Sequence, residues 1–170
     1  QTNAVLLSDR TLAERLYRAG IRSLFISFHS PKERTYARLT STSGQYQQAL
    51  QGIRTALEFP FKRVIFNMVL TRLNYTDIVP MVRLLRSLAV RSGTVLGFFP
   101  SVLNENKAWD KLHVRYSKVV PYLIRAYRLA PELFRGFSGD CAFPVCIGGL
   151  VKKVPALRPE QRIRSSTGYV

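Results

Sequence analysis

Two stretches of sequence, LFISF at residues 24–28 and VIFNMVL at residues 64–70, decide the fold class of this chain. Both are nearly continuous apolar runs rich in β-branched and aromatic residues, which is typical of buried parallel strands. Between them, residues 49–57 place apolar side chains at helical spacing. A strand, a helix and a second strand in this order predict a βαβ unit with parallel strands.

The same alternation extends outward in both directions. Further helices are predicted around residues 12–17 and 78–88 and from near Pro121 onward, and a weaker third strand at residues 94–99. Ser8 or Thr11 is expected to cap the first helix and Gly20 to follow its end. The polar stretch 30–45 is interpreted as a connection. The predicted fold class is therefore α/β, built from parallel (β/α) units.

Composition indicates one globular domain with no membrane-spanning segment. The chain has 170 residues, of which 46% are hydrophobic and 21% charged, values typical of folded domains. No apolar run approaches the roughly 18 residues of a spanning helix, and the first residues lack the pattern of a signal peptide. Two cysteines are too few for a disulfide framework. We expect a cytoplasmic protein that does not associate with membranes.

The charge balance is strongly basic. Lys and Arg number 26 against 10 Asp and Glu, a formal net charge of +16. Such an excess is a first indication of nucleic-acid binding, but the sequence has no block of five cations and no nucleic-acid motif. A soluble basic surface, or one that meets an acidic substrate or partner, is therefore preferred to specific nucleic-acid recognition. Residues 151–170 show no periodicity and are interpreted as a flexible basic tail after a domain at residues 1–150.

Polar residues interrupt one face of the two predicted strands. Because side chains alternate along a strand, Ser27 and His29 share one face of the first, and Asn67 and Thr71 share one face of the second. A buried amide without a partner costs roughly 1–3 kcal/mol. Asn67 is therefore satisfied either by neighbouring groups and water or by a polar ligand. Since both strands carry polar residues on one inferred face, near the carboxyl ends where α/β folds bind ligands, we favour a ligand pocket.

Other candidate chemistry is sparse. His29 and His113 have no metal-ligand spacing, and Gly148-Gly149 lacks the pattern of a phosphate-binding loop. Cys141 and Cys146 are separated by four residues. Two thiols are fewer than a closed zinc or iron–sulfur site requires. They are interpreted as reduced thiols packed near the end of the domain, and only as weak candidates for metal ligands.

The order of motifs along the chain resembles that of radical S-adenosylmethionine (SAM) enzymes. The matching segments are Thr2-Asn3, the helix ending at Gly20, Ile26–His29, Tyr36–Thr40, Gly44, Ala49–Ile53, Asn67–Tyr75, Arg115–Ser117 and Phe143–Cys146. Each motif is loose alone, but their order and spacing together are specific. The resemblance covers about residues 2 to 150.

This resemblance implies a partial TIM-like (β/α) barrel that binds SAM across the carboxyl ends of its strands. By likeness to the family, Ser27 and Arg38 would hold the methionyl carboxylate or the ribose, and Asn67 would lie nearby in the pocket. Asn3 would lie at the end of the third barrel strand, where Ala4 replaces the usual glycine of the family.

The cluster motif of the family is missing from this sequence. Radical SAM enzymes hold a [4Fe–4S] cluster with a C-x3-C-x2-C loop, which is expected to lie upstream of Gln1. The resemblance thus implies the carboxyl-terminal part of an enzyme that reductively cleaves SAM and abstracts hydrogen from an unknown substrate. The chain alone would be inactive. The alternative is a non-catalytic basic α/β module that binds nucleic acid or an acidic partner.

Overall fold

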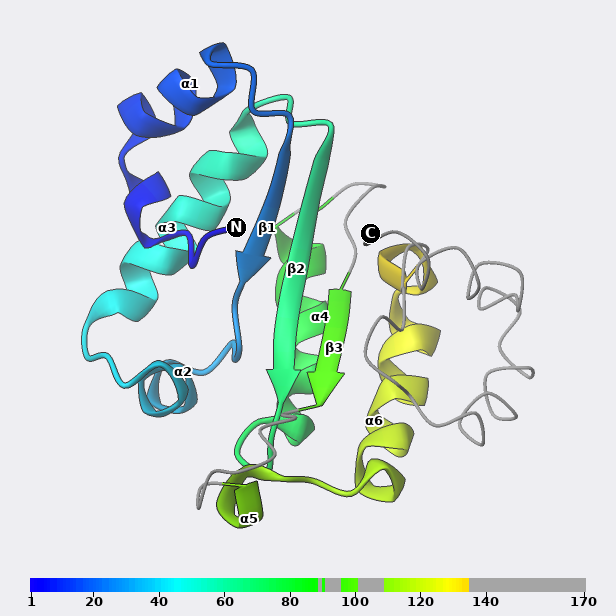
Figure 1. The fold of residues 1–170 in the computed structure, drawn as a ribbon. Coiled ribbons are helices and arrows are strands. Elements are labelled where there is room, and N and C mark those ends of the chain that lie inside the picture. The colour runs from blue at the N-terminus through cyan, green and yellow to red at the C-terminus, as the bar shows by residue number, and fades with distance from the viewer. Residues whose placement is uncertain (89, 91–95, 101–108, 135–170) are drawn as a thin grey trace, which may run out of the picture.

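The core of the protein is a three-stranded parallel sheet, seen in a computed structural model that describes residues 1–88, 90, 96–100 and 109–134. Strands β1 (Ser23–Ser27), β2 (Arg63–Leu70) and β3 (Leu96–Pro100) lie side by side in the order β1-β2-β3 (Figure 1). Both pairings are parallel. The predicted α/β class and parallel strands are confirmed.

The N-terminal residues of the chain lie beside β1. Thr2 pairs with Ile26 in a parallel bridge. The Thr2 N–H donates to the Phe25 carbonyl and the Ser27 N–H to the Thr2 carbonyl, both at 2.9 Å. Ala4 then adopts a φ of 67° and turns the chain into the short helix η1 (Val5–Ser8). That left-handed conformation favours glycine, which is the residue type that the family resemblance implies at this position.

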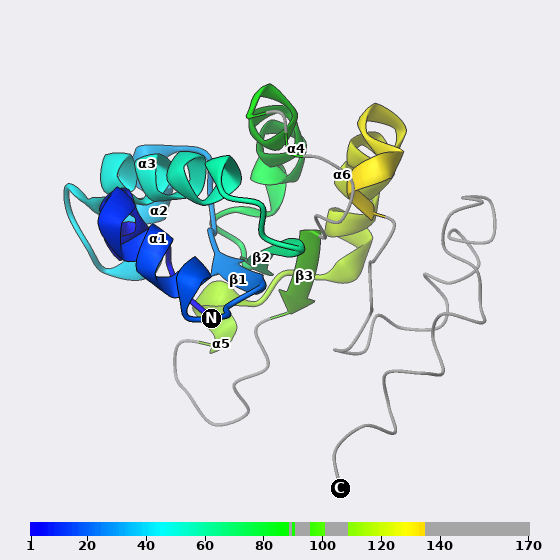
Figure 2. The same cartoon turned by 90° about the horizontal axis from the view of Figure 1, so that it is seen from above.

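The longer helices cover one face of the sheet. They are α1 (Arg10–Arg18), α2 (Glu33–Thr40), α3 (Gln45–Glu58), α4 (Ile78–Ser87) and α6 (Tyr116–Leu129). Figure 2 shows all five on the same side of the strands. The uniformly apolar strand face, which includes Ile26, Phe66 and Met68, is fully buried there. The opposite strand face, which carries Ser27 and Asn67, points away from these helices.

One glycine sets how closely η1 approaches α3. A Cβ added at Gly52 would lie 1.8 Å from the carbonyl oxygen of Ala4 and 3.0 Å from the Ser8 nitrogen. Only a residue without a side chain lets this backbone pass so close. Gly52 therefore lets the backbone from Ala4 to Ser8 pack directly against α3.

Several local predictions were wrong. The cap of α1 is Asp9, which accepts from the Thr11 N–H, not Ser8 or Thr11. The polar stretch 30–45 contains α2, whose polar surface hid its helical period. Helix α6 begins at Tyr116 and carries Pro121 inside it, because packing of its apolar face outweighs the loss of one backbone donor.

Other predictions fall on residues outside the described part of the chain. Cys141 and Cys146 are among them, as is the tail at 151–170. In the ranges that the structure does describe, no helix is long and apolar enough to cross a membrane.

Candidate functional site

A row of polar or small residues crosses the face of the sheet that the helices leave uncovered. Ser27 of β1 pairs with Asn67 of β2, and Asn67 pairs with Gly97 of β3. Directly paired residues project from the same face of a sheet, so the predicted common face of Ser27 and Asn67 is confirmed.

The Asn67 side chain is buried without a partner. Its exposed fraction is 6%, and its Oδ1 finds no hydrogen-bond donor among the described residues. A buried acceptor left unpaired costs roughly 1–3 kcal/mol. This atom is what a ligand with an N–H or O–H donor would satisfy.

Two further residues of the expected site, Asn3 and Arg38, have exposed side chains. Asn3 follows Thr2 and is exposed, and its Oδ1 accepts from the Val5 N–H at 3.1 Å. Arg38 lies on α2 with an exposed side chain. No hydrogen bond or ion pair within the described ranges joins Arg38 or Asn3 to Asn67. The structure therefore pairs Ser27 with Asn67, and Asn3 directly follows Thr2, whose carbonyl accepts from the Ser27 N–H. Arg38 has no such link to this row within the described ranges.

His29 and Thr71, which were expected on the same face, have structural partners. His29 Nδ1 accepts from the Val69 N–H at 3.2 Å, and burial lowers the pKa of its imidazole. The Thr71 N–H and hydroxyl both donate to Asn74 Oδ1, at 2.7 and 3.0 Å. The His29 bond joins the ends of β1 and β2, and the Thr71 bonds close the loop after β2. Both side chains are thus already used within the protein.

Asn74 is the centre of that bonding. It is fully buried, and its Nδ2 donates to the carbonyls of His29 and Val69, each at 2.8 Å. With Oδ1 accepting from Thr71, the amide uses all of its hydrogen-bonding groups. Asn74 directly precedes the short helix η2 (Tyr75–Asp77), but its side chain makes no cap bond there and instead joins the two strand ends.

A buried carboxylate, which sequence analysis missed, supports the same loops. The Asp77 side chain is 1% exposed and lies 2.5 Å from Lys32 Nζ. The Ser30 hydroxyl donates to its Oδ2 at 2.7 Å. Because Ser30 and Lys32 follow β1 while Asp77 precedes α4, the ion pair and hydrogen bond join the loops that leave β1 and β2. A lone Asp before a helix gives no sequence signal for such a role.

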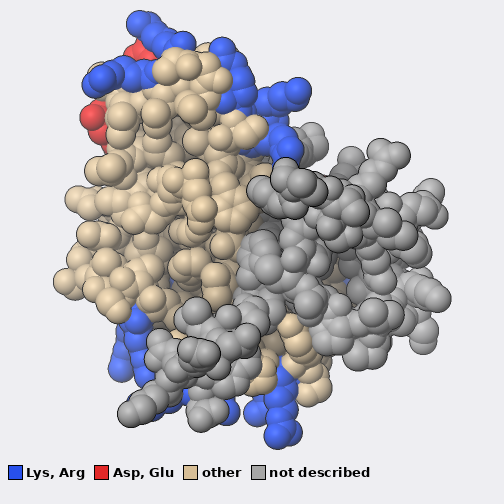
Figure 3. Space-filling view, viewed as in Figure 1, with Lys and Arg blue, Asp and Glu red and all other residues tan. Residues whose placement is uncertain are grey.

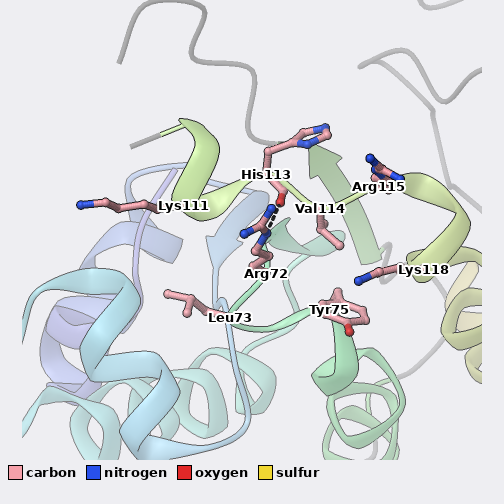
Figure 4. Close-up of a pocket in the computed structure, with 8 residues that line it drawn as sticks. All are labelled: Arg72, Leu73, Tyr75, Lys111, His113, Val114, Arg115 and Lys118. Carbon is pink, nitrogen blue, oxygen red and sulfur yellow. Dashed lines mark hydrogen bonds between the residues drawn. The ribbon is translucent and has the colours of Figure 1, made fainter. Parts of the chain in front are cut away.

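A second feature that sequence analysis missed is a basic pocket at the carboxyl end of the sheet (Figure 4). It has a volume of about 820 Å³ and is lined by Arg72, Leu73, Tyr75, Lys111, His113, Val114, Arg115 and Lys118. Within the described ranges the lining includes no carboxylate. The acidic side chains visible in Figure 3 lie at the opposite end of the molecule. The run of cations at 111–118 was the available signal.

Two hydrogen bonds and an aromatic contact hold the wall of this pocket in place. The Arg72 N–H donates to the Leu112 carbonyl at 2.8 Å, and Arg72 Nε donates to the His113 carbonyl at 3.1 Å. Tyr75 meets Tyr122 of α6 edge-on, with ring centroids 5.5 Å apart. The loop after β2 is thereby fastened to the segment before α6.

The described residues contain no group of three or more side chains suited to a metal ion. The whole sequence has only two cysteines, fewer than the three that the radical SAM cluster motif supplies. A [4Fe–4S] cluster therefore does not fit this chain alone. The buried oxygen of Asn67 is a hydrogen-bond acceptor that no described residue uses.

Comparison with known proteins finds a relative that matches part of this chain. No family model matches the sequence. A probable GTP 3′,8-cyclase of Saccharolobus islandicus is 26% identical over 99 residues, which cover 58% of this chain. The match spans 31% of the relative's length, or about a third. GTP 3′,8-cyclases are radical SAM enzymes, so the comparison points to the same superfamily that the order of motifs resembles.

Proposed function

We propose that residues 1–150 form the carboxyl-terminal portion of the core domain of a radical SAM enzyme, and that they bind SAM along the row of Ser27 and Asn67. The observation that carries this proposal is the buried Asn67 Oδ1, which has no hydrogen-bond partner among the described residues and belongs to the strand face that carries Ser27. The parent enzyme would abstract hydrogen from an unknown substrate.

The order and direction of the strands support a barrel. Thr2, β1, β2 and β3 are neighbours in chain order, and all are parallel. Right-handed crossovers between successive neighbours put every helix on one side, as in a (β/α) barrel, whereas doubly wound sheets cover both faces. We propose that the sheet is part of such a barrel, with Ser27 and Asn67 on its inner face.

In this proposal, protein groups bind and orient SAM. Asn67 Oδ1 accepts a hydrogen bond from an N–H or O–H of the ligand, and the Ser27 hydroxyl contributes a second polar contact. Arg38 would hold the carboxylate or ribose, and Asn3 would close the edge beside β1. The radical chemistry of the family would be supplied by SAM together with the cluster. The residues present here do not fit the cluster, so it would be held by residues outside this sequence.

The test compares two asparagines that the structure treats differently. Asn67→Leu removes a buried oxygen without a partner, so the melting temperature should stay equal or rise. SAM affinity, titrated by calorimetry, should fall by about one to two orders of magnitude, the equivalent of roughly 1–3 kcal/mol. Ser27→Ala should lower SAM affinity in the same direction, but less.

Asn74→Leu is the matched control. It breaks four hydrogen bonds and should lower the melting temperature clearly, because an unmade buried bond costs roughly 1–3 kcal/mol. A wild-type chain that does not bind SAM contradicts the proposal. So does an Asn67→Leu variant that binds SAM normally while losing stability.

A further inference from the structure

The basic pocket at the carboxyl end of the sheet has no assigned ligand, and its charges are unbalanced. Four cations line it, namely Arg72, Lys111, Arg115 and Lys118. Every ion pair in the described part of the chain is formed by other residues. Figure 4 shows Lys118 pointing toward the pocket, whereas Lys111 points away from Arg72. Like charges that line one pocket repel one another, and a bound anion would relieve that repulsion.

The amino terminus of α6 adds to the positive potential. Arg115 occupies the cap position without a side-chain cap bond, and no acidic residue lies in the first turn. Lys118 lies in that turn, where the helix dipole is already positive and a cation is unfavourable. A helix terminus with this arrangement of charges suits an anionic group in front of it.

Arg72 is positioned in advance for such a group. Its Nε is held by the His113 carbonyl at 3.1 Å, while its two terminal nitrogens have no partner among the residues described. Figure 4 shows the Arg72 guanidinium between the loop after β2 and the segment that precedes α6. A guanidinium fixed in this way presents two donors to a phosphate or carboxylate at little entropic cost.

We propose that this pocket binds the phosphate groups of a small phosphorylated substrate. The inference rests on the proposed function, since it places a substrate at the same end of the sheet as SAM. A phosphate chain carries the several negative charges that four cations balance. The volume of about 820 Å³ falls in the range of small-molecule sites, roughly 300–1,000 Å³. Nucleic acid is less favoured, because it needs cations along an extended track and these surround one hollow.

The experiment measures binding of tripolyphosphate and ATP to the 170-residue chain by calorimetry, without SAM. The pocket variant is Arg115→Gln with Lys118→Gln, which leaves the structural bonds of Arg72 intact. The control variant is Arg34→Gln with Arg83→Gln, two exposed cations on α2 and α4. Both variants lose two positive charges, so only their position differs.

We expect the pocket variant to weaken binding of both probes by at least about tenfold, since it removes two charge-assisted contacts to phosphate. The control should change binding less than about twofold. Equal weakening in both variants, or no binding by the wild type, would overturn the proposal. An RNA oligonucleotide that binds more tightly than ATP and is weakened equally by both variants would also overturn it, in favour of a nucleic-acid surface.

Failure here is separable from failure of the proposed function. If the chain binds phosphate but not SAM, the proposed phosphate site is supported and the proposed radical SAM function is contradicted. If the chain binds SAM through Asn67 but does not bind phosphate, the proposed function is supported and the phosphate site is contradicted.

Discussion

Two asparagines near the end of β2 show how burial separates a binding group from a structural one. Asn74 uses its whole amide on backbone and Thr71 groups, whereas Asn67 leaves its Oδ1 unpaired. Both are buried, at 0% and 6% exposure. The difference lies in their partners, because backbone groups at the strand ends reach Asn74, whereas no group of the described residues donates to Asn67 Oδ1 in mid-strand.

A prediction at the scale of one residue concerns the pH dependence of stability that His29 causes. Its Nδ1 accepts from the Val69 N–H, and burial lowers the pKa of the folded imidazole below the usual 6.5. As the pH falls below about 6.5, the unfolded chain takes up a proton that the folded chain does not, so stability decreases. The slope is at most about 1.4 kcal/mol per pH unit, down to the lowered pKa.

The measurement compares urea unfolding of the wild type and His29→Asn between about pH 7.5 and about pH 5. Asparagine offers a neutral acceptor near the position of Nδ1. The wild type should lose more stability than the variant over this range. Identical pH dependence in the two proteins would show that His29 does not bind its proton more weakly in the folded state.

At the scale of elements, the contact between η1 and α3 depends on Gly52. On helix propensity alone, Gly52→Ala would stabilise α3 by up to about 1 kcal/mol. The new Cβ would instead meet the Ala4 carbonyl, and overpacking costs typically 1–3 kcal/mol. We therefore expect Gly52→Ala to lower the free energy of unfolding by about 1–3 kcal/mol in urea titrations.

Gln51→Ala, at the exposed neighbouring position of α3, is the control and should change stability by less than about 0.5 kcal/mol. A Gly52→Ala protein more stable than the wild type would mean that η1 does not pack against α3 in this way.

At the scale of the whole molecule, the number of cysteines limits the chemistry of the isolated chain. Two thiols cannot supply the three cysteines of the cluster motif. Anaerobic incubation of the 170-residue chain with iron and sulfide should give no stable brown protein. Fewer than about two irons should remain bound after gel filtration. A protein that retains about four irons per chain would contradict this expectation.

Periodicity and alternation were enough to predict the parallel strands, most of the helices and the face shared by Ser27 and Asn67. These depend on the spacing of apolar side chains along the chain, which each segment carries locally. The helix at Glu33–Thr40 and the start of α6 at Tyr116 escaped, because tertiary packing outweighed polar composition and an internal proline.

The partners of the polar residues were decided by tertiary structure. Which asparagine is satisfied, how Asp77 joins Ser30 and Lys32, and where Arg72, Lys111, Arg115 and Lys118 meet all involve residues far apart in sequence. Hydrogen bonds and charges act over a few ångströms, and only the folded chain sets those distances.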